Sequence, residues 1–380
     1  MTEILNAARA LQREQVSFLR DLVLCESPSD SAPDVGRFVD LFAASVASFA
    51  KIRRVKGGAF GPHMIAEFET PGPKRRAGQI LGLGHSDTVW PLGTLRSMPW
   101  RESNGRLWGP GVLDMKGGLA QFVFAVRVLR ELDLPVGKKV LLLVNSDEEV
   151  GSPSSKPLTE KLAKQSDAVL VLEPGTGLAG KLKTARKGVG RFGLRVEGVA
   201  SHAGVDFAAG ASAILELSRH VGAISSLTKL DRGVTVNVGV ISGGTRSNVV
   251  AAEARAEIDI RVPRMKDWTG VERALKRLRP RDKRCRLHLE GGLNRPPMER
   301  TPGVARLAKL AIGLGREMGI EIEESSTGGG SDGNFTAGLG IPTLDGVGPV
   351  GEGAHAPHES ILVDRIADRT ALLAGLLLRI

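Results

Sequence analysis

Histidine and carboxylate side chains come directly after several short apolar runs in this sequence. The run ILGLG leads into His85 and Asp87, the run VLLLVNSD leads into Glu148 and Glu149, and the run AVLVLEP contains Glu173 near its end. Such runs are typical of parallel strands that are covered on both faces. An α/β sheet places its ligand-binding residues at the carboxyl ends of its strands. We therefore expect these side chains to meet at one edge of a sheet.

Two further segments carry residues of the same chemical types. Asp114 stands at the predicted start of a helix in GPGVLDMKGG, and GEGAHAPHE carries His355 and His358. Taken singly, these residues have ordinary explanations, since an Asp before a helix usually caps free backbone N–H groups and a lone histidine is usually structural. Several carboxylates at one sheet edge would repel one another, however, unless a cation lies between them. The set as a whole therefore predicts a metal site.

Nitrogen and oxygen ligands without a thiolate favour Zn²⁺, with Co²⁺ or Mn²⁺ as alternatives. Two zinc ions per subunit would bring four positive charges, which three carboxylates and one hydroxide ion would balance. A pair of metal ions activates a water molecule for attack at neutral pH. The chain contains no tyrosine, so acid–base work is left to His, Asp, Glu, Ser, Lys or Arg.

The order of predicted elements indicates an α/β domain that is interrupted by a second domain. Helices and strands alternate in the first part of the chain, as in a layered α/β protein. The middle part reads β-α-β-β-α-β, the split βαβ arrangement of a ferredoxin-like domain. We predict a three-layer catalytic domain with a mixed, largely parallel sheet (residues 1–183 and 296–380). An inserted ferredoxin-like α+β domain is predicted at residues 184–295. The expected helices are 3–24, 33–49, 117–132, 155–165, 208–226, 266–278, 302–318 and 361–379, and the expected strands are 63–69, 80–84, 139–145, 168–172, 189–198, 234–241, 250–262, 285–290, 320–325 and 341–345.

The composition excludes several classes of protein. With 42% hydrophobic and 25% charged residues, the chain is expected to fold around a core rather than to be disordered or fibrous. No apolar run approaches the ~20 residues of a membrane span, and the amphipathic start MTEILNAARALQREQ lacks the apolar centre of a signal peptide. Cys25 and Cys285 imply no disulfide framework. We expect a cytoplasmic protein with no membrane partner.

The net charge of +10 is concentrated in the middle of the chain. The segment from Lys181 to Arg295 holds 23 basic and 11 acidic residues, a balance of +12, which leaves −2 for the rest. This density is compatible with nucleic-acid binding, or with a solvated helix face. We favour the solvated face, because VERALKRLRPRDKR keeps apolar residues at helical spacing and no aromatic residues are interleaved.

The motifs, taken in order, resemble those of a known enzyme family. HSDTV, GPGVLDMKGG, SDEEVGS, VLEPG, VASHAG, GGTRSNVV with DIRV, GGGSDG and AHAPHE are similar to segments of the co-catalytic dizinc peptidases and deacylases. That family includes aminoacylases, acetylornithine deacetylase and succinyl-diaminopimelate desuccinylase. SHAG, SN…DIRV and GGGSDG are most similar to bacterial glutamate carboxypeptidase. The resemblance covers nearly the whole chain, and it implies a homodimer in which the inserted domain serves as a lid and for dimerisation.

The resemblance also implies a set of metal ligands. Asp114 would bridge both zinc ions, His85 and Glu173 would complete the ligands of one ion, and Glu149 and His355 would complete those of the other.

One position departs from the family pattern. The ligand histidine of the family lies four residues before an acidic residue, which here is Glu359, and this spacing selects His355. His358 occupies a position more often held by Asp or Asn, and we expect it to be a surface residue.

Catalytic roles follow from the same resemblance. Glu148 would be the general base that takes a proton from the attacking water and returns it to the leaving amine. Asp87 would hold the imidazole of His85 and fix its tautomer. His202, contributed by the partner subunit, would stabilise the oxyanion of the tetrahedral intermediate.

The resemblance assigns three substrate contacts. Arg261 would bind the free carboxylate of the substrate with both arms of its guanidinium. Asn248 would hydrogen-bond beside it, and Ser331, after three glycines, would contact the substrate from the catalytic domain.

We therefore expect a zinc-dependent hydrolase that cleaves an amide bond next to a free carboxylate, with glutamate carboxypeptidase activity first. The substrate would be a small N-acyl amino acid or a short peptide, and no nucleic-acid partner is expected. An N-acyl-amino-acid deacylase or a dipeptidase is the alternative within the family. A non-catalytic module that binds through the basic inserted domain is the alternative of a different class; the presence of Glu148 and of all five inferred ligands argues against it.

Overall fold

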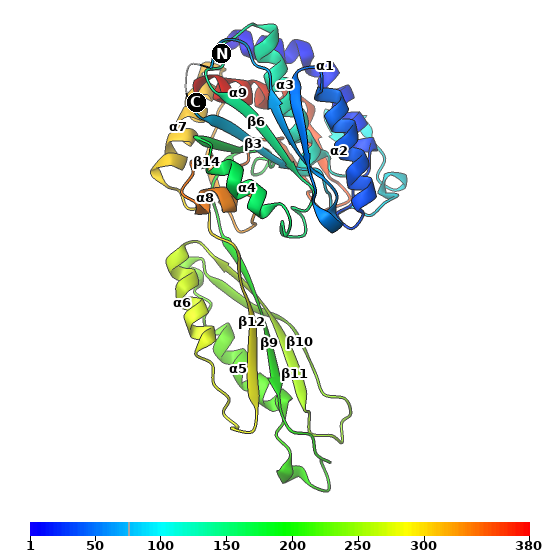
Figure 1. Ribbon diagram of the computed structural model, residues 1–380, viewed down its shortest axis with the longest axis vertical. Coiled ribbons are helices and arrows are strands. Elements are labelled where there is room, and N and C mark those ends of the chain that lie inside the picture. The colour runs from blue at the N-terminus through cyan, green and yellow to red at the C-terminus, as the bar shows by residue number, and fades with distance from the viewer. Residues whose placement is uncertain (75–76) are drawn as a thin grey trace. The chain divides into compact units, whose positions relative to one another are not determined.

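A mixed β-sheet forms the centre of the larger of the two units into which the chain divides. The computed structural model describes residues 1–74 and 77–380. Unit 1 comprises Met1–Ala185, Arg300–Thr327 and Ser331–Ile380, and unit 2 comprises Arg186–Glu299 with Gly328–Gly330. Figure 1 labels the elements along the chain.

The central sheet of unit 1 has the strand order β1-β2-β6-β3-β7-β14. Strand β3 is parallel to both of its neighbours, β6 and β7, and β14 is parallel to β7, whereas β1, β2 and β6 pair antiparallel. The prediction of an α/β fold with a mixed sheet is thereby confirmed. The strands are β1 (Ala50–Val55), β2 (His63–Phe68), β3 (Gln79–His85), β6 (Lys139–Asn145), β7 (Ala168–Val171) and β14 (Thr343–Leu344).

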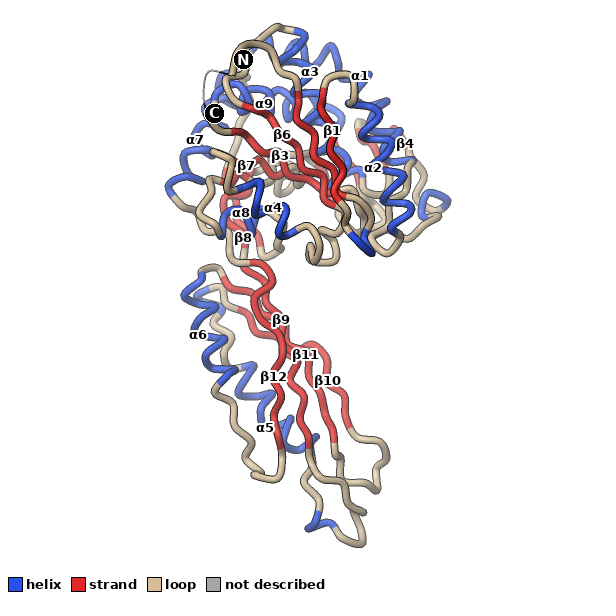
Figure 2. Tube along the Cα trace, in the orientation of Figure 1, coloured by secondary structure: helices blue, strands red, loops and turns tan. Residues whose placement is uncertain are grey.

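Helices cover both faces of this sheet, because its inner strands alternate apolar side chains between two cores. Val140, Leu142 and Val144 of β6 join the core formed with α1, α3 and α9, whereas Leu141 and Leu143 join the core beneath α4. This three-layer arrangement can be followed in Figure 2. The helices of unit 1 are α1 (Thr2–Leu24), α2 (Ala32–Val46), α3 (Gly117–Glu131), α4 (Lys156–Ala163), α7 (Pro302–Glu317), α8 (Gly333–Gly338) and α9 (Ile366–Arg379).

Most of the short strands of unit 1 lie outside the predicted set, whereas β13 overlaps the expected strand 320–325 at residues 324 and 325. A second sheet has the order β15-β16-β5-β4, and β13 pairs with β8. These strands are β4 (Arg101–Ser103), β5 (Arg106–Trp108), β8 (Leu182–Arg186), β13 (Glu324–Thr327), β15 (Gly351–Glu352) and β16 (Ser360–Leu362). The last helix was expected from residue 361, but it begins at Ile366, because Ser360–Leu362 pairs with β5 instead.

Unit 2 is a twisted antiparallel sheet with helices packed on one face. Its strand order is β10-β11-β9-β12, and the chain order is β-α-β-β-α-β. Apolar side chains of the sheet, among them Leu194 and Ile258, pack against Leu217 of α5 and Trp268 of α6. The elements are β9 (Gly188–Glu197), α5 (Ala213–Ser225), β10 (Thr235–Gly243), β11 (Glu253–Val262), α6 (Met265–Lys276) and β12 (Arg286–Arg295).

Two predicted boundaries in unit 2 differ from the structure by five residues each. Helix α5 begins at Ala213 rather than at residue 208, because Ser212 caps it by accepting a hydrogen bond from the N–H of Leu215. Strand β12 continues to Arg295, five residues past its expected end, since Gly291 and Gly292 stay paired with β9 instead of ending the strand. Within the described residues of the chain, no helix is both long and apolar enough to cross a membrane.

Candidate metal centre

The parallel strands of unit 1 bring the predicted ligands to one edge of the central sheet. His85 is the last residue of β3 and lies opposite Asn145, the last residue of β6. Glu173 follows β7 by two residues. The loop after β6 carries Glu148 and Glu149 to the same edge, so the expectation that strand ends gather these side chains agrees with the geometry.

Asp114 lies between two histidines that come from distant parts of the chain. Its Oδ1 is 3.3 Å from Nε2 of His85, and its Oδ2 is 3.4 Å from Nε2 of His355. Asp114 belongs to the segment Val112–Lys116, which leads into α3, and its own backbone is extended rather than helical (φ −118°, ψ 92°). Each oxygen of one carboxylate therefore faces a different imidazole, which is the arrangement that a bridging ligand requires.

A second carboxylate accompanies each histidine. Glu173 Oε1 lies 3.8 Å from Nε2 of His85, and Glu149 Oε1 lies 3.3 Å from Nε2 of His355. The donor atoms of His85, Asp114 and Glu149 all lie within 4.8 Å of one another, as do those of His85, Glu148 and Glu173. These two groups share His85, and one of them contains the predicted base Glu148. Asp114 connects the groups to His355, because its carboxylate is near both histidines.

Hydrogen bonds between the histidines and the carboxylates shift the pKa values of both kinds of group. Burial opposes ionisation of Asp114, but hydrogen bonds from His355 and His85 outweigh it and hold the pKa of this carboxyl far below its usual range. Hydrogen bonds to Asp114 and Glu149 raise the pKa of His355 to about 10. Burial lowers the pKa of His85, yet its bonds to Asp114 and Asp87 raise it well above the ordinary value.

The residues present fit a pair of divalent cations. Burial raises the pKa of Glu149, and its Oε1 is a buried acceptor with no well-directed hydrogen bond, although His355 is near. A buried acceptor without a donor is costly, and a cation would satisfy it. The imidazole and carboxylate donor set, which contains no thiolate, suits zinc.

Asp87 contacts more of the site than predicted. Its main-chain carbonyl, rather than its carboxylate, accepts the hydrogen bond from Nδ1 of His85 at 2.8 Å, and Oδ1 is 3.5 Å from the same nitrogen. The carboxylate accepts the N–H of Glu148 on Oδ1 and the N–H of Glu149 on Oδ2, each at 3.2 Å, and Oδ2 also accepts the hydroxyl of Ser29. One side chain therefore fixes the backbone of the predicted base and of a predicted ligand.

A buried polar network beneath this loop was missed by the sequence reasoning. Asp147 Oδ2 accepts bonds from the N–H and the hydroxyl of Ser154, at 2.6 and 2.7 Å. His63 on β2 lies between Ser154, at 3.1 Å from Nε2, and Ser146, at 2.8 Å from Nδ1. The signal was the polar run NSDEE directly after an apolar strand, of which only the last two residues were considered.

In unit 2, His202 and Asn248 lie on adjacent segments. His202 forms an antiparallel bridge with Val249, and the N–H of Ala203 donates to the carbonyl of Asn248 at 2.9 Å. Both side chains are exposed. The structure therefore brings Asn248 next to His202.

Arg261 lies at the other end of the same sheet, so the prediction that Asn248 sits beside it is wrong within one chain. Arg261 pairs with Val189 at the start of β9, whereas Glu253, five residues after Asn248, pairs with Glu197 at its end. The eight residue-to-residue steps from 253 to 261 span roughly 26 Å of strand. One copy of unit 2 cannot present both residues to the same small ligand.

Two predicted residues of unit 1 differ in their exposure. Ser331 is fully buried, and its hydroxyl donates to Oδ2 of Asp345 at 2.6 Å. Its contact with a substrate stays a prediction. His358 is exposed, as expected for a surface residue.

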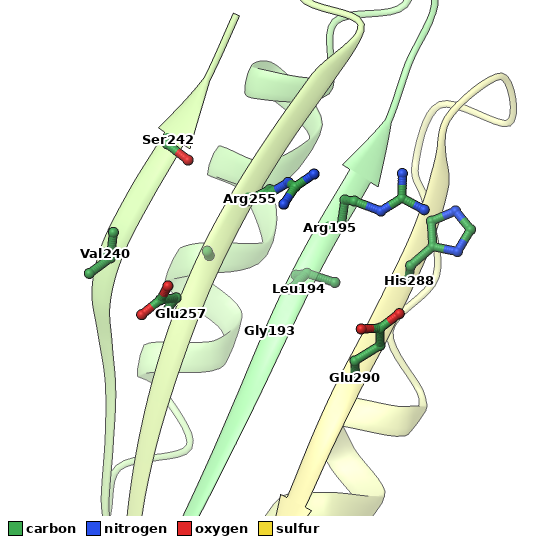
Figure 3. Close-up of a pocket in the computed structure, with 10 residues that line it drawn as sticks. Gly193, Leu194, Arg195, Val240, Ser242, Arg255, Glu257, His288 and Glu290 are labelled. Carbon is green, nitrogen blue, oxygen red and sulfur yellow. The ribbon is translucent and has the colours of Figure 1, made fainter. Parts of the chain in front are cut away.

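Basic residues on the open face of the unit 2 sheet pair with neighbouring carboxylates. On the open face of its sheet, a hollow of about 480 Å³ lies over Gly193, with Arg195 and Arg255 on adjacent strands (Figure 3). Arg195 pairs with Glu197 at 2.5 Å, and Arg255 pairs with Glu253 at 2.6 Å. This pairing favours a solvated charged face over an uncompensated anion-binding surface.

Paired histidine and carboxylate clusters at the carboxyl edge of an α/β sheet define a metal-dependent hydrolase. The family model described as peptidase family M20/M25/M40 matches residues 82–379. The chain belongs to this family and is an enzyme of its metallopeptidase and amidohydrolase class.

Individual relatives agree with this assignment. The chain is 27% identical to carboxypeptidase G2 of Pseudomonas sp. (strain RS-16), over 99% of this chain and 91% of that protein. It is 28% identical to succinyl-diaminopimelate desuccinylase of Cereibacter sphaeroides (strain KD131 / KCTC 12085), over 96% of this chain and 98% of that protein.

Solved structures share the fold over nearly the full chain. The aminopeptidase PepT of Bacillus cereus superposes with a TM-score of 0.83 at 22% identity, covering 97% of this chain and 98% of that one. The YXEP protein of Bacillus subtilis, a dinuclear metal-binding peptidase, superposes with a TM-score of 0.68 at 14% identity, covering 97% and 98%.

Proposed function

We propose that this enzyme hydrolyses an amide bond next to a free carboxylate and releases a C-terminal amino acid, with glutamate as the first candidate. The observation that carries the proposal is the position of Asp114, whose two oxygens each face a histidine that has its own carboxylate neighbour. This geometry provides for two cations side by side, and the similarity to carboxypeptidase G2 supports the choice of reaction.

The proposed metal ligands are those predicted from the sequence. His85 and Glu173 would hold one zinc ion, Glu149 and His355 the other, and Asp114 both. Two bound zinc ions would polarise the scissile carbonyl and lower the pKa of the attacking water.

The remaining chemistry belongs to side chains of the protein. Glu148 would accept a proton from the water as its oxygen bonds to the carbonyl carbon, and would deliver that proton to the nitrogen as the C–N bond breaks. His202 would donate a hydrogen bond to the oxyanion. Arg261 would bind the substrate carboxylate. Asn248, which lies next to His202, would donate a hydrogen bond to the substrate.

We also propose that the enzyme is a homodimer in which each active site takes His202 and Asn248 from one chain and Arg261 from the other. The register of β11 against β9, which places Arg261 at the opposite end of the sheet from the segment that carries Asn248, supports this arrangement. Strand β10 is an edge of its sheet, and its Ile241 is 56% exposed; α5, which packs on β10, exposes 52% of Leu215. An unpaired edge strand beside exposed apolar side chains favours pairing with a second copy.

Zinc-loaded protein should be assayed for amino-acid release from a panel of N-acyl and N-aroyl amino acids and dipeptides. Glutamate release that is lost in Glu148→Gln, with the metal content unchanged, is the expected result. Glu131→Gln, which changes an exposed glutamate at the end of α3, is the matched control and should leave the rate unchanged.

Other outcomes of the panel lead to defined conclusions. Release of a different amino acid, or of an acyl group from a range of amino acids, would favour the deacylase or dipeptidase alternative, which the similarity to the desuccinylase supports. A panel without any product, at two metal ions per chain, would contradict the proposed reaction and favour a binding role.

Cys25 and Cys285 are free thiols, which supports the expected cytoplasmic location.

A further inference from the structure

Glu359 is a buried carboxylate whose two oxygens accept four hydrogen bonds. Its Oε1 accepts the backbone N–H groups of Leu113, at 2.8 Å, and of Asp114, at 3.0 Å. Its Oε2 accepts the N–H of Gly111, at 2.9 Å, and the indole N–H of Trp90, at 2.7 Å. Glu359 itself is 1% exposed, so these bonds replace the water that an ionised carboxylate would otherwise bind.

The donors belong to segments that carry proposed ligands. Trp90 lies five residues after His85, the N–H of Asp114 belongs to the proposed bridging ligand itself, and Glu359 lies four residues after His355. A turn in which the N–H of Glu359 donates to the carbonyl of Ala356 at 2.9 Å ties the carboxylate to the histidine segment. One side chain therefore joins the three segments that provide His85, Asp114 and His355.

We propose that Glu359 is a positioning residue of the metal centre, which sets the place of Asp114 relative to both histidines. The inference rests on the proposed metal ligands. Charge-assisted hydrogen bonds are strong and directional, so the bond from Glu359 fixes the backbone N–H of Asp114. The carboxylate of Asp114 is separated from this fixed backbone only by its own short side chain. With that backbone fixed, Oδ1 faces His85 and Oδ2 faces His355.

The competing explanation is that Glu359 only stabilises the fold, by accepting hydrogen bonds from backbone N–H groups of a loop that would otherwise lack a partner. Unit 2 offers a matched control for this, because Glu216 is also fully buried and accepts backbone N–H groups. Its partners are Arg281, at 2.7 Å, and Asp282, at 3.2 Å, and His220 lies 2.9 Å from its Oε1. Glu216 contacts no proposed ligand, so its loss would affect stability alone.

The test compares metal binding by Glu359→Gln, Glu216→Gln and the wild type, using Zn²⁺ and Co²⁺ titrations of the full-length metal-free protein. A glutamine keeps the shape of Glu359, but its amide nitrogen would point at two N–H donors. We expect Glu359→Gln to weaken metal affinity about 10- to 100-fold, the usual effect of removing a group that orients ligands. The visible absorption of bound Co²⁺ should change as well, because the position of Asp114 changes.

The control outcomes separate positioning from stability. Glu216→Gln should melt at a lower temperature and yet bind both metals with wild-type affinity and the wild-type Co²⁺ spectrum. A Glu359→Gln protein that binds Co²⁺ with unchanged affinity and spectrum would overturn the proposal. If Glu359→Gln does not fold, Trp90→Phe decides, since it removes one donor and leaves three. Its Co²⁺ affinity should fall by a smaller factor, about 2- to 10-fold, and an unchanged affinity and spectrum would overturn the proposal.

Failure of this inference and failure of the proposed function give different results. If the wild-type protein binds metal but hydrolyses none of the panel substrates, the proposed function is contradicted. The metal titrations of the Glu359 variant still test the positioning role in that case. A wild-type protein that binds no divalent ion overturns both.

Discussion

Asp259 occupies two nitrogens of Arg261, the residue proposed to bind the substrate carboxylate. Arg261 Nε donates to Oδ1 of Asp259 at 2.8 Å, and Nη2 donates to Oδ2 at 3.0 Å. The two residues stand two positions apart on β11 and therefore on the same face of the sheet. A substrate carboxylate that uses the same fork must compete with Asp259 or approach the remaining N–H groups.

We predict that Asp259→Asn lowers KM for a carboxylate substrate by about 2- to 10-fold, with kcat unchanged, because the neutral amide competes less well for the guanidinium. Arg261→Lys should raise KM instead, since an ammonium cannot match the planar fork. Steady-state kinetics of the purified variants check both. A higher KM in Asp259→Asn would mean that the carboxylate orients Arg261 more than it competes.

The distance between His202 and Arg261 predicts complementation between inactive variants. A chain with His202→Ala keeps its own Glu148, and a chain with Glu148→Gln keeps a His202 that it can lend. Each variant alone should be nearly inactive. An equimolar mixture, after subunit exchange, should recover about a quarter of wild-type activity, since half of the dimers are mixed and each mixed dimer has one intact site.

The control for complementation is a mixture of Glu148→Gln and Glu148→Ala chains, in which no site has a base. That mixture should stay inactive. Recovery near zero in the first mixture, with subunit exchange shown by mass spectrometry of differently tagged chains, would count against sharing of His202 between chains.

Much of the central sheet could be predicted from the sequence, because its inner strands are long enough to show their pattern. Val140–Val144 is apolar at every position, and β6 indeed contributes alternately to two cores. Strands of two or three residues, such as Gly351–Glu352 and Arg106–Trp108, carry no periodic pattern, and their pairing depends on partners far away in the chain. Such strands follow from tertiary contacts alone.

The candidate ligands could be predicted because strand ends and motif order identify them, but their supporting contacts could not. In the sequence, Glu359 served only to select His355 by its spacing. Its structural role depends on four donors that lie 245 to 269 residues away along the chain. The place of Asn248 depends on the register of β11 against β9. That register is set by side-chain packing across the whole sheet, which a local motif does not record.

Asp87 gives a prediction about the loop that holds Glu148 and Glu149. Asp87→Asn leaves the main-chain bond to His85 intact, but its single amide oxygen can serve only one of the two N–H groups. We expect kcat to fall about 10- to 100-fold, with a smaller loss of metal affinity. Ser29→Ala, which removes only the third bond to this carboxylate, is the control and should have a much smaller effect. Equal kcat values in Asp87→Asn and the wild type would show that the loop needs no such support.

Metal binding should release protons near neutral pH. Hydrogen bonds to Asp114 and Glu149 raise the pKa of His355 to about 10, so its imidazole carries a proton at pH 7. The pKa of His85 is also raised, which favours its protonated form. A metal ligand must be neutral imidazole, so binding displaces these protons and affinity rises with pH below about 10. Calorimetric Zn²⁺ titrations in buffers of different ionisation enthalpy should give up to about two protons released per chain at pH 7. Binding without proton release would contradict a role for these histidines as ligands.

Lys116 provides a test of stability against pH that is independent of catalysis. Its ammonium is buried, donates to the carbonyl of Cys25 at 2.9 Å and lies over the ring of Phe38. Burial lowers the pKa of Lys116 from 10.5 to about 8. Between these two values the unfolded chain binds a proton that the native protein does not, so the free energy of unfolding gains a rising contribution as pH increases.

Lys116→Met should therefore differ from the wild type in its pH dependence. The methionine removes both the buried charge and the hydrogen bond to Cys25. The difference in the free energy of unfolding at a single pH therefore combines two effects, whereas its change with pH reports the charge. From pH 8 to 10.5 the wild type should gain stability relative to this variant, by about 3 kcal/mol in full, because a shift of one pKa unit corresponds to about 1.4 kcal/mol. Urea unfolding across this window measures the difference. Lys51→Met, at an exposed position of β1, is the control and should follow the wild type. Parallel curves for wild type and Lys116→Met would show that the buried lysine keeps its proton throughout.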